Sequence, residues 1–155
     1  MISVEALMKR ELVSVGPEAS AADAARAMRE AGVGAVLVLE QGCVAAIFTE
    51  RDLATRVVAE GRSPERTKVG EVATRPVVTV PAGTSLRQCA EALRGRGVRH
   101  LPVLEGGKPV GVISARDFFA AVAGGLEEWI ERARYDEKLR ENVDPYDHLG
   151  GSYGR

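Results

Sequence analysis

One stretch of the chain decides the fold: VGVISARD, at residues 110–117. It is an aliphatic run that closes on a hydroxyl, a guanidinium and a carboxylate. A second stretch of the same kind, AAIFTERD, lies at residues 45–52. In both, Ser or Thr is followed three residues later by Asp, which is the pattern of a helix N-terminus. Each stretch therefore predicts a buried strand that runs directly into a helix.

Two interpretations of the Ser/Thr-x-x-Asp unit stay open. In the structural one, the hydroxyl and the carboxylate only cap the helix that follows. In the functional one, the helix N-terminus and the hydroxyl bind a phosphate, and the Asp accepts hydrogen bonds from a ribose diol. Arg51 and Arg116 favour the functional interpretation, because a cap needs no guanidinium beside its carboxylate, although a solvated surface Arg is also compatible with the pattern.

The two stretches belong to an internal repeat. Asp52 falls on Asp117, and this offset of 65 residues holds without a gap from Val4 onward. It also places Gly32 on Gly97, where each glycine follows an amphipathic segment and is expected to end a helix. Chance does not produce an ungapped match of this length, so the chain holds two copies of one unit.

Each copy is predicted to read helix, strand, helix, strand, strand, helix, because the hydrophobic period changes in that order. In the first copy these elements are expected at residues 3–8, 12–15, 20–32, 35–39, 44–48 and 49–61, and in the second at 67–73, 77–80, 84–97, 100–104, 110–113 and 114–125. The domain boundaries are then 1–61 for the first repeat, 62–66 for a polar linker and 67–125 for the second repeat.

A single copy has too small a core to stand alone, so the two are expected to pack sheet to sheet in one body. The fold class is α/β (α+β). The continuous aliphatic character of the paired strands indicates that both faces of each sheet are covered. The pseudo-two-fold relation then brings both strand-to-helix corners to a common cleft.

Composition excludes several classes of function. The chain has 155 residues and a net charge of −1, so it lacks the basic footprint of a nucleic-acid-binding protein. No apolar run is long enough to span a membrane and no leader precedes the first repeat, which predicts a soluble cytoplasmic protein. Cys43 and Cys89 form no CxxC pair and are expected to be simply buried.

No catalytic motif stands out. The sequence holds no nucleophile–base pair, no clustered metal-ligand set and no Walker-type loop, so no enzymatic activity, cofactor or metal is expected.

Residues 126–155 lie outside the repeat. Leu126, Trp129, Ile130 and Ala133 follow helical spacing among charged residues and predict an amphipathic helix over about 126–140. This helix either covers the flank of its own module or forms a contact with a second copy or a partner protein, with Trp129 as the anchor. The residues beyond Asn142 are expected to fray.

With these motifs, the chain resembles a tandem pair of cystathionine-β-synthase (CBS) domains, a Bateman module. The resemblance covers about residues 4–124 and rests on GVRHLPV at 97–103, GVISARD at 111–117 and the order of elements. It implies an adenosyl ligand (AMP, ADP, ATP or S-adenosylmethionine) in the cleft between the repeats, and regulation of an unidentified protein partner. It also implies a homodimer built through the helices of the modules.

The resemblance further implies roles for individual residues. The ribose carboxylates would be Asp52 and Asp117; the phosphate ligands Thr49, Ser114, Arg51, Arg116, Arg99 and His100; and the walls of the adenine pocket Val13, Val77, Val78 and Pro102.

The two sites are not expected to be equivalent. The first copy has Gly34-Ala35 where the second has Arg99-His100, and it lacks the counterpart of Pro102. If phosphates point toward the neighbouring repeat, the basic pair serves the nucleotide on Asp52, which predicts that this corner is the better phosphate binder. The main hypothesis is a stand-alone ligand sensor. The alternative is a dimerisation scaffold with empty pockets.

Overall fold

The computed structural model describes residues 1–140, with side chains up to residue 137. It consists of two units, Met1–Asp117 and Phe118–Arg155. The predicted fraying after Asn142 falls outside the described residues. Both three-stranded sheets and the helices that cover them belong to the first unit.

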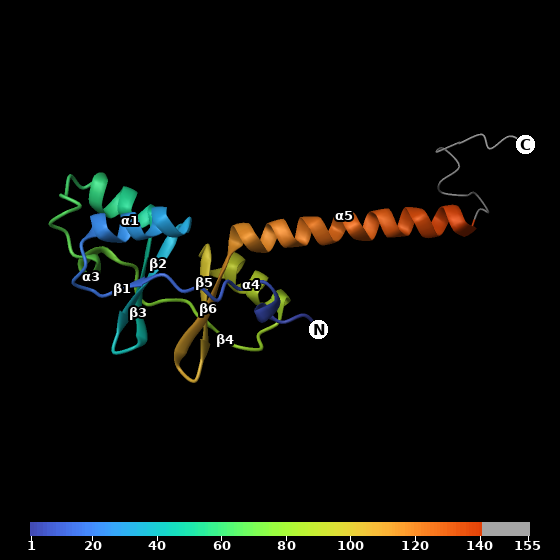
Figure 1. Ribbon diagram of the computed structural model, residues 1–155, viewed down its shortest axis with the longest axis horizontal. Helices are drawn as coiled ribbons and strands as arrows, with labels where there is room; N and C mark the ends of the chain where they lie inside the picture. The colour runs from blue at the N-terminus through green and yellow to red at the C-terminus, as the bar shows by residue number, and fades with distance from the viewer. Residues whose placement is uncertain (141–155) are drawn as a thin grey trace, which may run out of the picture. The chain divides into compact units, whose positions relative to one another are not determined.

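The predicted order of elements is found in both repeats (Figure 1). The first contains η1 (Val4–Ala6), β1 (Ser14–Val15), α1 (Ala21–Ala31), β2 (Ala35–Glu40), β3 (Cys43–Thr49) and α2 (Glu50–Asp52), which continues as the π-helical η2 (Leu53–Val58). The second contains α3 (Val69–Val72), β4 (Val80–Pro81), α4 (Leu86–Arg96), β5 (His100–Glu105), β6 (Lys108–Ser114) and α5 (Ala115–Arg140).

Helix ends follow the local chemistry of the sequence. The Ser20 hydroxyl accepts a hydrogen bond from the backbone of Asp23 and begins α1, as Ser85 does for α4 with Gln88. Both helices then end at a glycine in the left-handed region, the position that the repeat alignment had predicted, with φ of 64° at Gly32.

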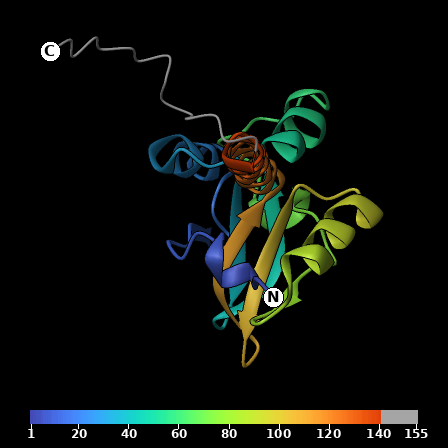
Figure 2. The ribbon, with the colours of Figure 1, turned by 90° about the vertical axis from the view of Figure 1, so that its right-hand side faces the viewer.

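The two sheets have the same topology. In each, a short first strand pairs parallel with the second, and the second pairs antiparallel with the third, giving the orders β1-β2-β3 and β4-β5-β6. β3 lies against β6, and Figure 2 shows the two sheets facing each other. This arrangement confirms the predicted sheet-to-sheet packing and the mixed α/β class.

The segments that open the two repeats are exchanged in space. α3 belongs to the second copy, yet Val69 and Val72 are buried in the core of the first repeat, together with Phe48. Conversely, η1 lies on the second repeat, where the Val4 backbone N–H donates to the Thr84 carbonyl at 2.8 Å. The sequence boundaries at residues 61 and 67 therefore do not match the packing in space, because each repeat packs together with the opening segment of the other copy.

A two-residue antiparallel bridge extends each exchange. Lys9 exchanges two backbone hydrogen bonds of 2.9 Å with Val112 of β6, and Thr74 pairs in the same way with Ile47 of β3. Figure 2 shows the N-terminal segment beside β6. Lys9 and Thr74 are 65 residues apart, so the exchange follows the repeat symmetry.

One sequence prediction about helices is wrong. The last helix of the second repeat was expected to end near Gly124-Gly125, with a separate helix after it, but α5 runs without a break from Ala115 to Arg140. Glycine adopts helical φ and ψ at a cost of about 1 kcal/mol, and the strong helix formers that follow Leu126 continue the helix. Leu126, Trp129 and two earlier residues, Phe119 and Val122, are exposed along it.

The second repeat has Gly111 where the first has Ala46. The close passage of the exchanged N-terminal segment over β6 explains this difference. A Cβ added to Gly111 would lie 2.5 Å from Met8 Sδ and 3.1 Å from the Lys9 carbonyl oxygen. We expect Gly111→Ala to lower the free energy of unfolding by about 1–3 kcal/mol, the usual cost of overpacking, measured by urea denaturation.

Gly95→Ala is the matched control, because nothing lies within 4 Å of a Cβ at Gly95 in α4. This control should raise stability by about 0.5–1 kcal/mol. Equal, small effects of the two substitutions would show that the N-terminal segment does not pack tightly on β6.

Candidate functional site

The first corner, between β3 and α2, is a complete capping box. The Asp52 backbone N–H donates to Thr49 Oγ1 at 3.2 Å, and the Thr49 backbone N–H donates to Asp52 Oδ2 at 3.0 Å. The other carboxylate oxygen, Asp52 Oδ1, accepts a hydrogen bond of 2.9 Å from Thr74 Oγ1 and lies 3.7 Å from Arg56 Nε. Asp52 is only 5% exposed, so its carboxylate is buried with partners on both oxygens.

The second corner, between β6 and α5, is more open. The Asp117 backbone N–H donates to Ser114 Oγ at 3.1 Å, which caps α5. The Asp117 side chain is 34% exposed and forms an ion pair, with Lys9 Nζ 3.2 Å from Oδ2. Burial alone would raise the pKa of Asp117, but hydrogen bonds from Ser114 and Lys9 and the charges of Lys9 and Arg116 hold that pKa below its ordinary value.

Thr74, which contacts Asp52, and Lys9, which contacts Asp117, both come from the exchanged segments. The sequence analysis did not predict either contact. Lys9 is the repeat counterpart of Thr74, as Asp117 is of Asp52. The 65-residue offset contained this signal, but it could not show that residues 9 and 74 cross to the opposite repeat. These contacts are compatible with both the structural and the functional interpretation. Each Asp belongs to the N-terminal cap of a helix, and both line a cavity.

A cavity of about 870 Å³ joins the two corners, within the 300–1,000 Å³ typical of small-molecule sites. Eleven of the twelve predicted site residues line it: Val13, Thr49, Arg51, Asp52, Val77, Val78, Arg99, His100, Ser114, Arg116 and Asp117. Pro102 does not, because its side chain is fully buried inside the second sheet. The expected wall of the adenine pocket therefore consists of the three valines.

The charges that line the cavity are nearly balanced. The cations are Lys9, Arg29, Arg51, Arg99 and Arg116, and the anions are Glu11, Glu50, Asp52 and Asp117. Of these, Arg51, Arg99 and Arg116 are exposed to solvent. Such a site attracts a compact anion through local contacts, whereas a long polyanion needs a broad positive surface.

His100 crosses from the second repeat to the first. A Cβ on Gly34 would lie 3.6 Å from His100 Nε2 and 3.2 Å from Glu50 Oε2. The first repeat thus has glycine at this position where the imidazole of the other repeat approaches. Burial lowers the pKa of His100, the charge of Arg99 lowers it further, and the carboxylates of Glu50 and Asp117 partly oppose this.

The expected order of phosphate binding at the two corners stays a prediction, whereas the geometry bears on which of the two carboxylates a ligand can reach. The sequence predicts stronger phosphate binding at Asp52, from Arg99 and His100. The structure adds two facts that the sequence reasoning did not consider, the burial of Asp52 and the ammonium group of Lys9 at Asp117. Both favour Asp117 as the more accessible corner.

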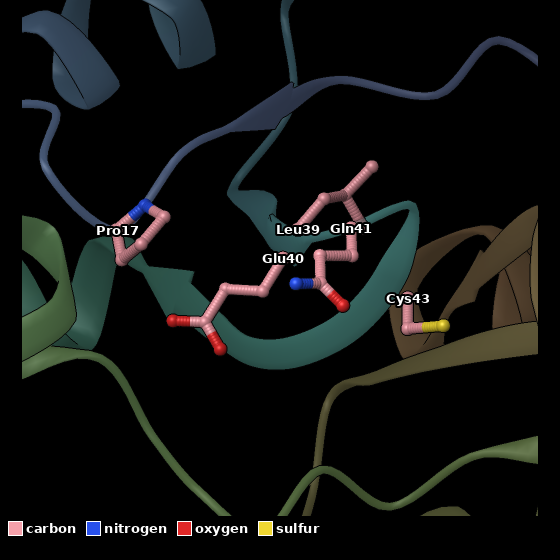
Figure 3. Close-up of a pocket in the computed structure, with 5 residues that line it drawn as sticks. All are labelled: Pro17, Leu39, Glu40, Gln41 and Cys43. Carbon is pink, nitrogen blue, oxygen red and sulfur yellow. The ribbon is translucent and has the colours of Figure 1, made fainter.

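A second hollow, of about 650 Å³, lies beside the β2–β3 hairpin and is lined by Pro17, Leu39, Glu40, Gln41 and Cys43 (Figure 3). Figure 3 shows the Cys43 thiol pointing away from Glu40. This hollow lacks the converging charges of the larger cavity. Cys43 is exposed, against the prediction of burial, because it begins an edge strand; Cys89 is buried as predicted, and burial raises the pKa of its thiol.

Among residues 1–140, no cluster of His, Cys, Asp or Glu has the arrangement of a metal site. None of the helices in this range combines the length and apolar character needed to cross a membrane.

Comparison with known proteins places these features in a family. The family model for the CBS domain matches residues 4–59 and 69–124. The CBS domain-containing protein YhcV of Bacillus subtilis is 32% identical over 117 residues, which cover 76% of this chain and 83% of that protein.

Solved structures agree with this result. A CBS-domain containing protein from Agrobacterium tumefaciens is 35% identical, with a TM-score of 0.71 over 77% of this chain and 98% of that one. The CBS domain pair of protein MJ0100, in complex with 5′-methylthioadenosine and S-adenosyl-L-methionine, has a TM-score of 0.74 over 81% of this chain and 98% of that one. At 17% identity this second likeness shows the fold alone.

The lowered pKa of His100 predicts a pH dependence of stability. Because the folded-state pKa lies below the ordinary 6.5, the unfolded chain binds more protons between the two values. Above pH 6.5, His100 therefore does not lower the free energy of unfolding. As the pH falls below that value, protonation of His100 in the unfolded chain lowers it. We expect the melting temperature to fall between pH 7.5 and 5.5, and to fall less in His100→Gln.

The comparison is made at both pH values, with His148 present in both proteins. The carboxyl of Asp117 does not interfere, since its lowered pKa affects stability only below about 3.8. An identical pH dependence in the wild type and the variant would contradict the lowered pKa of His100.

Proposed function

The chain belongs to the CBS domain family, and on this basis we propose that it is a regulatory module that binds an adenosyl ligand between its two repeats. The observation that carries the proposal is the cavity itself, which is lined both by the partly exposed carboxylate of Asp117 and by three exposed arginines, Arg51, Arg99 and Arg116. The complex of the MJ0100 domain pair with two adenosyl compounds supports the class of ligand.

The chemistry of the cavity suits such a ligand in three parts. The carboxylate of Asp117 accepts hydrogen bonds from the ribose hydroxyls. Val13, Val77 and Val78 supply an apolar surface for adenine. The exposed guanidinium groups bind phosphate, and AMP, ADP and ATP are the ligands that use all three parts.

The proposed role is regulation of a partner protein, without catalysis by this chain. The side chains that line the cavity can bind a ligand, but they include no pair of nucleophile and base. This combination suits a sensor rather than an enzyme. The two free thiols, Cys43 and Cys89, suit a reducing compartment, and we propose the cytoplasm as the location.

A scaffold that binds no ligand is the competing function, and the first corner favours it. Asp52 is buried, and both of its oxygens have protein partners. If Asp117 were equally occupied, both carboxylates would be structural. The two functions therefore differ in what removal of Asp117 does.

We expect Asp117→Ala to weaken binding of AMP by about 2–3 kcal/mol, or 30- to 150-fold, because two charge-assisted hydrogen bonds to the ribose are lost. The fold should persist, since the Ser114 hydroxyl still caps α5. Titration calorimetry measures the affinity, and thermal unfolding checks the fold. Asp23→Ala, at an exposed Asp outside the cavity, is the control for the change in charge.

Thermal-shift screening comes first and tests the class of ligand. Adenosyl compounds should raise the melting temperature, because a ligand that binds the folded state stabilises it by RT ln(1 + [L]/Kd). No shift with AMP, ADP, ATP or S-adenosylmethionine, together with a lower melting temperature in Asp117→Ala, would establish the scaffold instead.

We also propose that the protein is a homodimer that pairs through α5. Phe119, Val122, Leu126 and Trp129 are between 49% and 67% exposed and recur at intervals of three and four residues, which forms one apolar stripe.

Light scattering at tens of micromolar should therefore give twice the chain mass of 16.5 kDa, at a concentration chosen for a moderate interface. Leu126→Ala combined with Trp129→Ala should shift the protein to monomer. Glu128→Ala combined with Glu131→Ala, on the opposite face of α5, should leave the mass unchanged. A monomeric wild type contradicts the proposal.

A further inference from the structure

Two residues at equivalent positions of the exchanged segments contact the two equivalent carboxylates, but with different chemistry. The uncharged hydroxyl of Thr74 donates a hydrogen bond of 2.9 Å to the carboxylate of Asp52. Lys9 places an ammonium 3.2 Å from Asp117. Because the repeats are related by symmetry, the Thr74–Asp52 contact shows what the Lys9–Asp117 corner would be without the ammonium group.

The Lys9–Asp117 pair is also the looser of the two. The Lys9 side chain is 56% exposed and that of Asp117 34%, whereas the side chain of Asp52 is 7% exposed. An ion pair with this exposure contributes little to stability and exchanges readily with solvent. The Lys9 backbone, by contrast, is fixed to Val112 by two hydrogen bonds of 2.9 Å, so that only the side chain is free to reorient.

We propose that Lys9 is a specificity-determining residue, which makes the Asp117 corner selective for adenosyl ligands that carry a phosphate. This inference rests on the proposed function. When ribose hydroxyls bind Asp117, the ammonium of Lys9 moves from the carboxylate to the phosphate of the same ligand. The four-carbon stem of lysine provides the reach for this movement, and Arg116 lines the same part of the cavity.

The exchange of partners gives the selectivity. A phosphorylated ligand replaces the contact that Lys9 loses, so both the carboxylate and the ammonium keep a charged or hydrogen-bonding partner. Adenosine offers Lys9 no anion, and the ammonium then competes with the ribose for Asp117. At the first corner Thr74 carries no charge. The cation beside Asp52, Arg56, donates to the carbonyls of Val72 and Ala73 and does not line the cavity, so the Asp52 half lacks this discrimination.

The test compares AMP with adenosine, which differ only in the phosphate. Titration calorimetry is performed on the full chain as wild type and as Lys9→Thr, which copies the residue of the other corner. In Lys9→Thr the affinity for AMP should fall about 10-fold, as for one partly exposed charge-assisted contact, while the affinity for adenosine stays the same or rises. Lys9→Arg should retain most of the preference for AMP.

Lys68→Thr is the matched control. Lys68 is 53% exposed and ion-paired with Glu18, but it lies outside the cavity. It should leave the ratio of the two affinities unchanged. A purely structural role for Lys9 would lower both affinities together and would show in the melting temperature, whereas selectivity changes only their ratio.

The outcomes separate this inference from the proposed function. Binding of both compounds with a ratio that Lys9→Thr does not change overturns the role of Lys9 and leaves the adenosyl site standing. A change of the ratio in Lys68→Thr as large as that in Lys9→Thr also overturns it, since the effect is then one of net charge. If the wild type binds neither compound, the role of Lys9 is overturned. The proposed function fails as well only if ADP, ATP and S-adenosylmethionine also do not bind.

Discussion

The exchange of opening segments is the constraint on which the rest of the structure depends. Val69 and Val72, from the second copy, complete the core of the first repeat, and Val4, from the first copy, is fully buried on the second. A repeat separated from its neighbour would expose these side chains, at a cost of about 1.5–3 kcal/mol for each. The two repeats therefore form one body, and the cavity between their corners has fixed walls.

The same exchange explains how two copies of one motif acquire different properties. Each carboxylate meets a residue from the opposite end of the module, so a change at residue 9 or 74 alters one corner and leaves the other intact. With Thr74 as its partner, Asp52 is buried and serves mainly as a cap and an anchor for the exchanged segment. With Lys9 as its partner, Asp117 stays partly exposed and remains accessible to a ligand.

Much of this could be predicted from the sequence, because it depends on local patterns. The 65-residue offset, the Ser and Thr caps and the glycines at positions 32 and 97 define the repeat and its helices, and eleven of the twelve site residues line one cavity. What failed depends on tertiary contacts. Periodicity identifies a helix but not the body on which it packs, so the exchange and the roles of Lys9 and Thr74 were missed. Pro102 lies in the middle strand of its sheet with a fully buried side chain, and α5 continues through Gly124 because no residue there stops it.

The position of Asp117 connects recognition with assembly under the proposed function. Asp117 lies in the first turn of α5, and the apolar stripe from Phe119 to Trp129 lies on the same helix. The backbone N–H groups and dipole of a helix N-terminus favour a negative charge, so a phosphate bound at this corner acts directly on the start of α5. In the structure, Asp117 supplies this negative charge, and Lys9 partly neutralises it. Transfer of Lys9 to a phosphate would restore the full charge of Asp117 to the helix end, and the ligand would thereby stabilise the first turn of the element that carries the pairing surface.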